Sequence, residues 1–156
     1  MSTTTTSIAS VLNSLIETCR DGQEGFRTAA ENAKSNDFKS LFTELAAQRQ
    51  LFVGELRRLV SAIGEEAQTT GSVGGAIHRG WMDLKAAITH GGQHAILAEC
   101  ERGEDAAIDT YQQALAHEEL PDHIRRAVER QFVSINNVHD RIHVLRDRLT
   151  SQPVLG

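Results

Sequence analysis

The stretch EEAQTTGSVGG, residues 65 to 75, decides the topology of this 156-residue chain because it interrupts an otherwise helical pattern. Together with the residues up to Gly92, it separates two long helical segments by about 28 residues. Most connections between packed helices are far shorter. This connector is therefore too long for a tight turn, and it is long enough to travel the length of a helical bundle.

Four long segments around the connector carry apolar residues at the 3.6-residue period of an α-helix. The break at Ser35 supplies an N-cap, Gly64 suits the residue after a helix end, and Pro121 separates the last two segments. The predicted long helices cover residues 8–33, 38–63, 93–117 and 123–149, and a shorter helix of about four turns covers residues 74–90 and ends at Gly91 and Gly92.

Two short connections and one long one predict the fold. Short loops after the first and third long helices make two antiparallel hairpins, and the crossover makes the second and third helices parallel. This is the all-α topology of a ferritin-like four-helix bundle with a short extra helix in its crossover. We expect residues 1–7 to form a disordered polar cap, residues 8–149 the bundle domain and residues 150–156 a loose tail.

Composition and charge argue against several kinds of partner. The formal net charge is −5, whereas nucleic acids and anionic membranes favour clustered positive charge. The sequence shows neither a secretory signal nor an apolar run near the roughly 18 residues of a spanning helix. We therefore predict a cytoplasmic protein with no nucleic-acid or membrane partner, and a homo-oligomer stays an open alternative.

The two cysteines indicate reduced thiols. Cys19 and Cys100 are far apart in sequence, and both fall on inward helix faces at different heights. A disulfide between them is not expected, because the Cα atoms of a disulfide lie within about 7 Å of each other.

Four segments carry a resemblance to a known family: LNSLIETCRDGQEGF (12–26), GSVGGAIHRGWMDLK (71–85), ECERGED (99–105) and VHDRIHVLRD (138–147). They resemble an uncharacterised bacterial family of four-helix-bundle domains of unknown function within the ferritin-like superfamily. The resemblance spans residues 8–149, and HRGW and ECERGED are its more specific parts. It implies the fold and brings no established activity, so any site has to be derived from the residues themselves.

Several residues favour packing over chemistry. His78 and Trp81, in the HRGW segment, are expected to cap and pack the connector against the bundle. Gly22 and Gly25 lie on or near the inward face of the first helix, where small residues let another helix or a side chain approach closely.

A complete di-iron centre is not expected. Ferritin-like di-iron proteins need an inward Glu on each of two helices and an inward Glu-x-x-His on each of the other two. Glu17 and Glu24 face away from the apolar stripe of the first helix, and the second helix has no Glu-x-x-His. On the last helix, Asn136 stands three residues before His139, where a Glu would be needed.

The acidic stretch ECERGED is predicted to be mostly a solvated flank. On a helical wheel Glu104 shares the apolar face of its helix, whereas Glu99, Glu101 and Asp105 point sideways or outward. Glu104 should therefore be the one substantially buried acid of the stretch, and a buried carboxylate requires a counter-charge.

Arg49 is the predicted partner of Glu104. Arg49, Glu104 and His139 fall at one height when the helices are laid out, so we expect them to form a polar layer in the core. This layer is either a structural ion pair with a satisfied histidine or a metal or substrate site. Glu101, Glu104 and His139 are the candidate metal ligands, and iron or manganese is the metal that such donors would suit.

Two classes of function stay open. In the first, the protein is a structural or stress-associated bundle with no cofactor and no catalytic residue. In the second, it is a metal-binding protein with a degenerate carboxylate and histidine site. The missing Glu-x-x-His motifs favour the first class.

Overall fold

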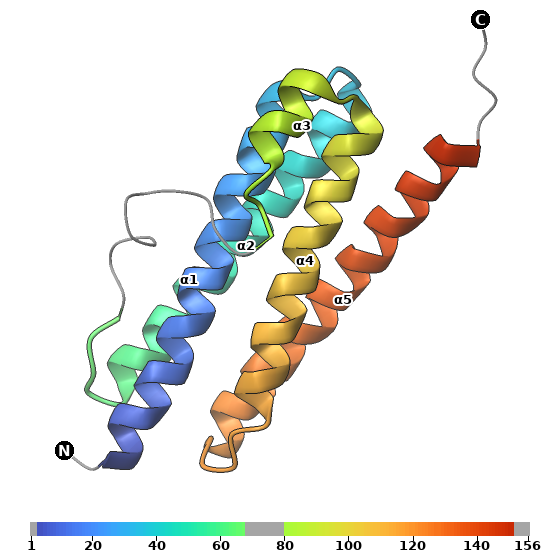
Figure 1. Ribbon diagram of the computed structural model, residues 1–156. Helices are drawn as coiled ribbons and strands as arrows, with labels where there is room; N and C mark the ends of the chain where they lie inside the picture. The colour runs from blue at the N-terminus through green and yellow to red at the C-terminus, as the bar shows by residue number, and fades with distance from the viewer. Residues whose placement is uncertain (1–2, 68–79, 152–156) are drawn as a thin grey trace, which may run out of the picture.

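The computed structural model describes residues 3–67 and 80–151, and within these ranges the protein is all-helical (Figure 1). The periodic segments of the sequence form the long helices. The helices are α1 (Thr3–Asn32), α2 (Asn36–Ala62), α3 (Leu84–His90), α4 (Gln93–Leu115) and α5 (Asp122–Ser151).

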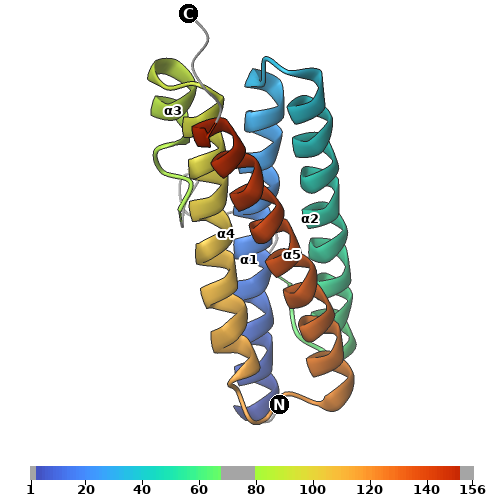
Figure 2. The same ribbon diagram turned by 90° about the vertical axis from the view of Figure 1, so that its right-hand side faces the viewer.

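The four long helices lie lengthwise beside one another, and α3 sits at one end (Figures 1 and 2). The helices α1 and α2 form one antiparallel hairpin, and α4 and α5 form another. Because the chain returns to the α3 end before α4 begins, α2 and α4 run in the same direction, as the long connector predicted. None of the helices in the described ranges has the length and apolar character needed to cross a membrane.

The helix ends lie within two residues of the prediction except at the starts of α1 and α3. The helix α1 begins at Thr3, so residues 3–7 are helical and not a disordered cap. The first turns of α1 pack against the rest of the protein. Ile8 and Ala9 are buried, and a 3.0 Å hydrogen bond joins Ser7 Oγ and His117 Nε2. At the other end, α5 continues to Ser151, two residues past the predicted end.

The connector helix is shorter than predicted, since α3 begins only at Leu84. Gly80 has a φ of +92° and lies against the backbone of Arg102, so the chain turns there instead of continuing a helix. Residues 68–79 lie outside the described residues, and so does the packing role expected of His78.

Trp81 fastens the connector to the long helices, as expected. Its side chain is buried and meets the ring of Phe26 edge to face, with 4.9 Å between the ring centroids. A Cβ on Gly25 would lie 2.3 Å from the indole, and a Cβ on Gly103 would lie 2.1 Å from it. The absence of a side chain at these two glycines therefore leaves the space that the indole occupies.

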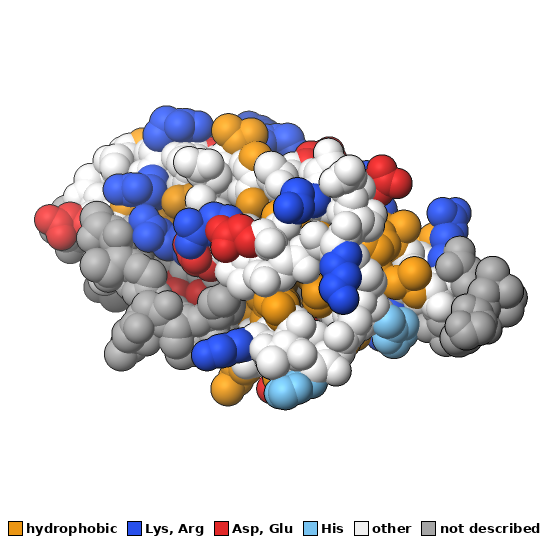
Figure 3. All heavy atoms as spheres, turned by 90° about the horizontal axis from the view of Figure 1, so that it is seen from above, with side chains coloured by type: hydrophobic (Ala, Val, Ile, Leu, Met, Phe, Trp, Pro, Cys, Tyr) orange, Lys and Arg blue, Asp and Glu red, His pale blue; other side chains and the backbone are white. Residues whose placement is uncertain are grey.

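The core consists of two apolar clusters, one toward each end of the long helices. One cluster contains the N-terminal halves of α1 and α5 and the C-terminal halves of α2 and α4. The other contains the C-terminal halves of α1 and α5, the N-terminal halves of α2 and α4, and α3. Buried polar side chains occupy the level between them, and the candidate site begins there. Viewed from the α3 end, charges of both signs lie interspersed on the surface (Figure 3).

Candidate functional site

An ion pair joins α2 and α4 between the two apolar clusters. Arg49 Nη1 donates to Glu104 Oε1 at 2.5 Å, and Nη2 donates to Glu104 Oε2. The side chain of Arg49 is 1% exposed and that of Glu104 is fully buried. The predicted burial of Glu104 and its pairing with Arg49 are confirmed. A paired, bidentate geometry is what an ion pair needs to offset its loss of hydration.

The surroundings of Arg49 fit its guanidinium. Gly22 of α1 leaves room for it, because a Cβ there would lie 3.1 Å from Arg49 Nη1. The ring of Phe26 lies beneath the guanidinium carbon at 5.3 Å, within cation–π range. Burial opposes the charged form of Arg49, but attraction and hydrogen bonds from Glu104 outweigh it, so the pKa of Arg49 lies above its ordinary value. Arg49 therefore keeps its positive charge inside the core.

A chain of hydrogen bonds runs from beside this pair toward the surface. Tyr111 donates to Gln131 Oε1 at 2.7 Å, which leaves its oxygen to accept from the thiol of Cys19 at 3.0 Å. Gln131 in turn donates to Glu55 at 2.7 Å, and Arg130 pairs with Glu55 at the protein surface. The buried polar groups of this chain are thus partnered by one another, as a stable core requires.

The two cysteines are buried free thiols, as expected. Burial raises the pKa of Cys19 to about 11 despite the nearby Arg49, and burial also raises the pKa of Cys100 well above its ordinary value. A buried, protonated thiol is a weak nucleophile. Neither cysteine has the environment of a reactive one.

Glu99 corrects the prediction that Glu104 is the one buried acid of ECERGED. Glu99 is 2% exposed. The connector covers it, since the backbone N–H of Asp83 donates to its Oε2 at 3.2 Å, and Arg102 pairs with its Oε1 at 2.7 Å. The helical wheel pointed Glu99 sideways or outward, and it gives no sign that residues 80–83 close over that flank.

His139 also corrects the prediction. It was expected in one layer with Arg49 and Glu104, but its ring is turned to the outer side of the contact between α4 and α5. Its partners are Asp105, Glu101 and its neighbour Asp140. The predicted height of His139 along the helices is therefore consistent with these contacts, but the predicted direction of its side chain, toward the core, is wrong.

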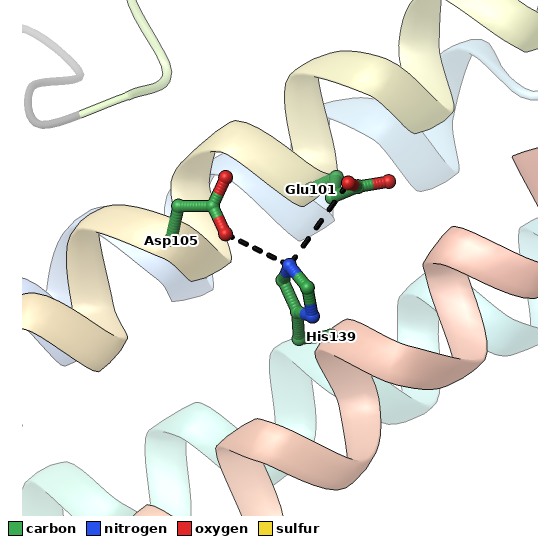
Figure 4. Close-up of side chains that lie close together, drawn as sticks. All are labelled: Glu101, Asp105 and His139. Atoms are coloured by element: carbon green, nitrogen blue, oxygen red, sulfur yellow. Dashed lines mark ion pairs between the residues drawn. The ribbon is translucent and has the colours of Figure 1, made fainter.

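The candidate metal ligands change accordingly. Glu104 is paired with Arg49 in the core, and Asp105 lies in its place beside Glu101 and His139 (Figure 4). His139 Nε2 lies 2.8 Å from Asp105 Oδ1 and 3.9 Å from Glu101 Oε2. One potential ligand atom from each of the three residues lies within 4.8 Å of the other two. Partial burial lowers the pKa of His139, but Asp140, Asp105 and Glu101 together raise it above its ordinary value.

His143 is a member of this surface cluster that the sequence reasoning missed. Its Nδ1 lies 3.2 Å from Glu101 Oε2, and its ring stacks in parallel on that of His139 at a centroid distance of 6.4 Å. The signal was present in the spacing, because His139 and His143 are four residues apart, as are Glu101 and Asp105. Residues four apart share one face of a helix.

The chain belongs to the family described as a domain of unknown function, DUF2383, whose profile matches residues 7–117. The match extends from α1 past the end of α4, so it includes Arg49 and Glu104 and ends before α5. A search of curated proteins finds no match to the chain.

Proposed function

We propose that this protein is a ferritin-like four-helix bundle whose central layer is closed by the Arg49–Glu104 pair and whose role is structural and not catalytic. The observation that carries the proposal is the fully buried, bidentate pair between the two apolar clusters. In a ferritin-like di-metal protein the bundle core holds inward carboxylates and histidines around the metals. Here a guanidinium supplies the positive charge at this level.

The residues of this layer do not fit a di-metal centre. Both oxygens of Glu104 accept hydrogen bonds from Arg49, and a cation beside Arg49 would be repelled. Gly22 stands where α1 would have to bring a carboxylate, and a side chain there would meet Arg49. His139 faces outward, away from the pair.

The alternative function was metal binding by Glu101, Glu104 and His139. That set does not act as one site, because Glu104 is engaged inside the core while Glu101 and His139 meet on the outer side of α4 and α5. The donors that stay available are those of the surface cluster, and they carry a separate proposal below.

Aerobic iron loading tests the proposed function. With tag-free protein, we expect Fe²⁺ to oxidise at the rate seen in buffer, without the absorption of an oxo-bridged di-ferric centre. Glu104→Gln should leave this result unchanged, and so should the paired substitution His139→Gln with His143→Gln. Rapid oxidation with two irons per chain, lost in Glu104→Gln and kept in the histidine variant, would contradict a metal-free core.

A further inference from the structure

We infer that Glu101, Asp105, His139 and His143 form a site for one divalent transition-metal cation of the Zn²⁺ class, on the outer side of the α4–α5 hairpin. The site is distinct from the Arg49–Glu104 layer and does not depend on the function proposed for that layer. Two carboxylates come from one helix and two imidazoles from the other (Figure 4 shows three of the four side chains).

The spacing on each helix brings the ligands together. Glu101 and Asp105 lie one turn apart on α4, and His139 and His143 lie one turn apart on α5. Glu101 is the centre of the group, because its Oε2 lies 3.9 Å from His139 Nε2 and 3.2 Å from His143 Nδ1. Ligand atoms about 2.0–2.2 Å from a common ion lie at most roughly 4.4 Å apart. Glu101, Asp105 and His139 offer ligand atoms within 4.8 Å of one another, and His143 is linked to this group through Glu101, so the side chains must move closer for all four to bind one ion.

Both histidines have an orienting partner on the nitrogen that faces away from the proposed ion. His139 Nδ1 lies 3.3 Å from Asp140 Oδ1, and His143 Nε2 lies 3.2 Å from Asp147 Oδ2. A carboxylate behind each imidazole is the common outer arrangement of metal-binding histidines, where it fixes the ring and raises its basicity. Two such carboxylates at one cluster distinguish it from an ordinary surface ion pair.

The charge of the cluster favours a cation. Four carboxylates surround the two imidazoles, those of Glu101, Asp105, Asp140 and Asp147. Arg146 is the nearby guanidinium, and its Nε lies 3.3 Å from Glu101 Oε1. Both oxygens of Glu101 lie near His143 Nδ1, at 3.3 and 3.2 Å, and Arg146 Nη2 lies 3.5 Å from the same nitrogen. The Arg146 side chain must therefore turn away from His143 Nδ1 when a metal ion binds there. When a metal ion binds, it replaces the proton that His139 Nε2 shares with Asp105, and that proton goes to solvent.

The donor set identifies the class of metal. Imidazole nitrogens suit Zn²⁺, Fe²⁺, Ni²⁺ and Cu²⁺, whereas Ca²⁺ and Mg²⁺ prefer oxygen ligands alone. Two nitrogens and two oxygens fill the four positions of a tetrahedral Zn²⁺ site. Because the ligands come from both helices, bound metal would tie α5 to α4 and stabilise the folded chain in proportion to its occupancy.

Zn²⁺ titration of the tag-free protein tests the proposal. We expect a single Zn²⁺ per chain by native mass spectrometry, a rise of the unfolding midpoint with Zn²⁺, and no comparable effect of Ca²⁺. Co²⁺ used as a spectroscopic probe should give the intense visible absorption of a tetrahedral site. His139→Gln with His143→Gln should weaken Zn²⁺ binding by more than about 100-fold, and Asp140→Asn or Asp147→Asn should weaken it by roughly 10-fold.

The control is His90→Gln with His94→Gln, which removes two exposed histidines outside the cluster, one at the end of α3 and one at the start of α4. This control should bind Zn²⁺ as the wild type does, and far-UV circular dichroism should show every variant folded, since the exchanged side chains lie at the surface. The proposal is overturned if the His139 and His143 variant keeps its Zn²⁺ affinity, if the control loses it, or if wild type binds no Zn²⁺ at millimolar concentration.

Discussion

The Arg49–Glu104 pair and the surface cluster both take acidic residues from the stretch ECERGED, yet the two sites lie in opposite environments. Glu104 is fully buried against Arg49, and the next residue, Asp105, is 59% exposed beside His139. Adjacent residues on a helix differ by about 100° in direction, and here that rotation separates the interior from water. A charge in the interior depends on its partner, whereas water screens a charge at the surface. The two regions should therefore respond very differently to the loss of one partner.

The largest effect is expected for Arg49→Leu. This change leaves Glu104 as a buried carboxylate without its counter-charge, and breaking a buried pair in this way typically costs about 3 kcal/mol or more. Urea unfolding followed by circular dichroism measures the loss. The double variant Arg49→Leu with Glu104→Leu should recover most of the stability, because it removes both charges. A single variant as stable as wild type would show that water reaches this layer.

Gly103→Ala should destabilise the protein by about 2 kcal/mol, because overpacking a core typically costs 1–3 kcal/mol. Gly103 belongs to ECERGED and faces the connector, so a Cβ there would lie 2.1 Å from the buried indole of Trp81. Gly54→Ala is the matched control on α2, where a Cβ would meet only the end of Arg58 at 3.6 Å. The control should gain up to about 1 kcal/mol from helix propensity. Thermal unfolding measures both variants, and equal shifts of their unfolding midpoints would contradict the close packing of Trp81 against Gly103.

These contrasts show what the sequence could and could not predict. The 3.6-residue period places Arg49 and Glu104 inward on their own helices, and the length of the connector makes α2 and α4 parallel, so their pairing was predictable. The burial of Glu99 depends on residues 80–83, which no periodic pattern positions. A helical wheel gives a direction relative to its own helix and not the neighbour that covers a flank. The four-residue spacing places Asp105 on one face with Glu101 and His143 on one face with His139, but only the folded structure shows that these two faces meet.

Glu99→Gln should have an intermediate effect of about 1 kcal/mol. Its side chain is 3% exposed, but it pairs with Arg102, which is largely in water. The amide oxygen of Gln still accepts from the N–H of Asp83, so the variant loses charge without leaving that donor unpaired. The free energy of unfolding in urea gives the size of the effect. Glu99→Ala serves as the harsher comparison and should cost more, and a loss as large as that of Arg49→Leu would contradict this order.

The smallest effect on the stability of the metal-free protein is expected for Glu101→Gln. Glu101 contacts His143 and Arg146 at the edge of α5, where both partners keep contact with solvent. The Glu101 side chain itself is 13% exposed, but ion pairs whose partners lie in water contribute about 0–1 kcal/mol, and salt weakens them further. Urea unfolding with a chelator present should therefore separate Glu101→Gln from wild type by less than about 1 kcal/mol. With Zn²⁺ added the two proteins should diverge, because wild type gains the stability of a bound ion and the variant loses a ligand. A large loss already in chelator would mean that the surface cluster supports the fold by itself, and the contrast with the Arg49–Glu104 layer would disappear.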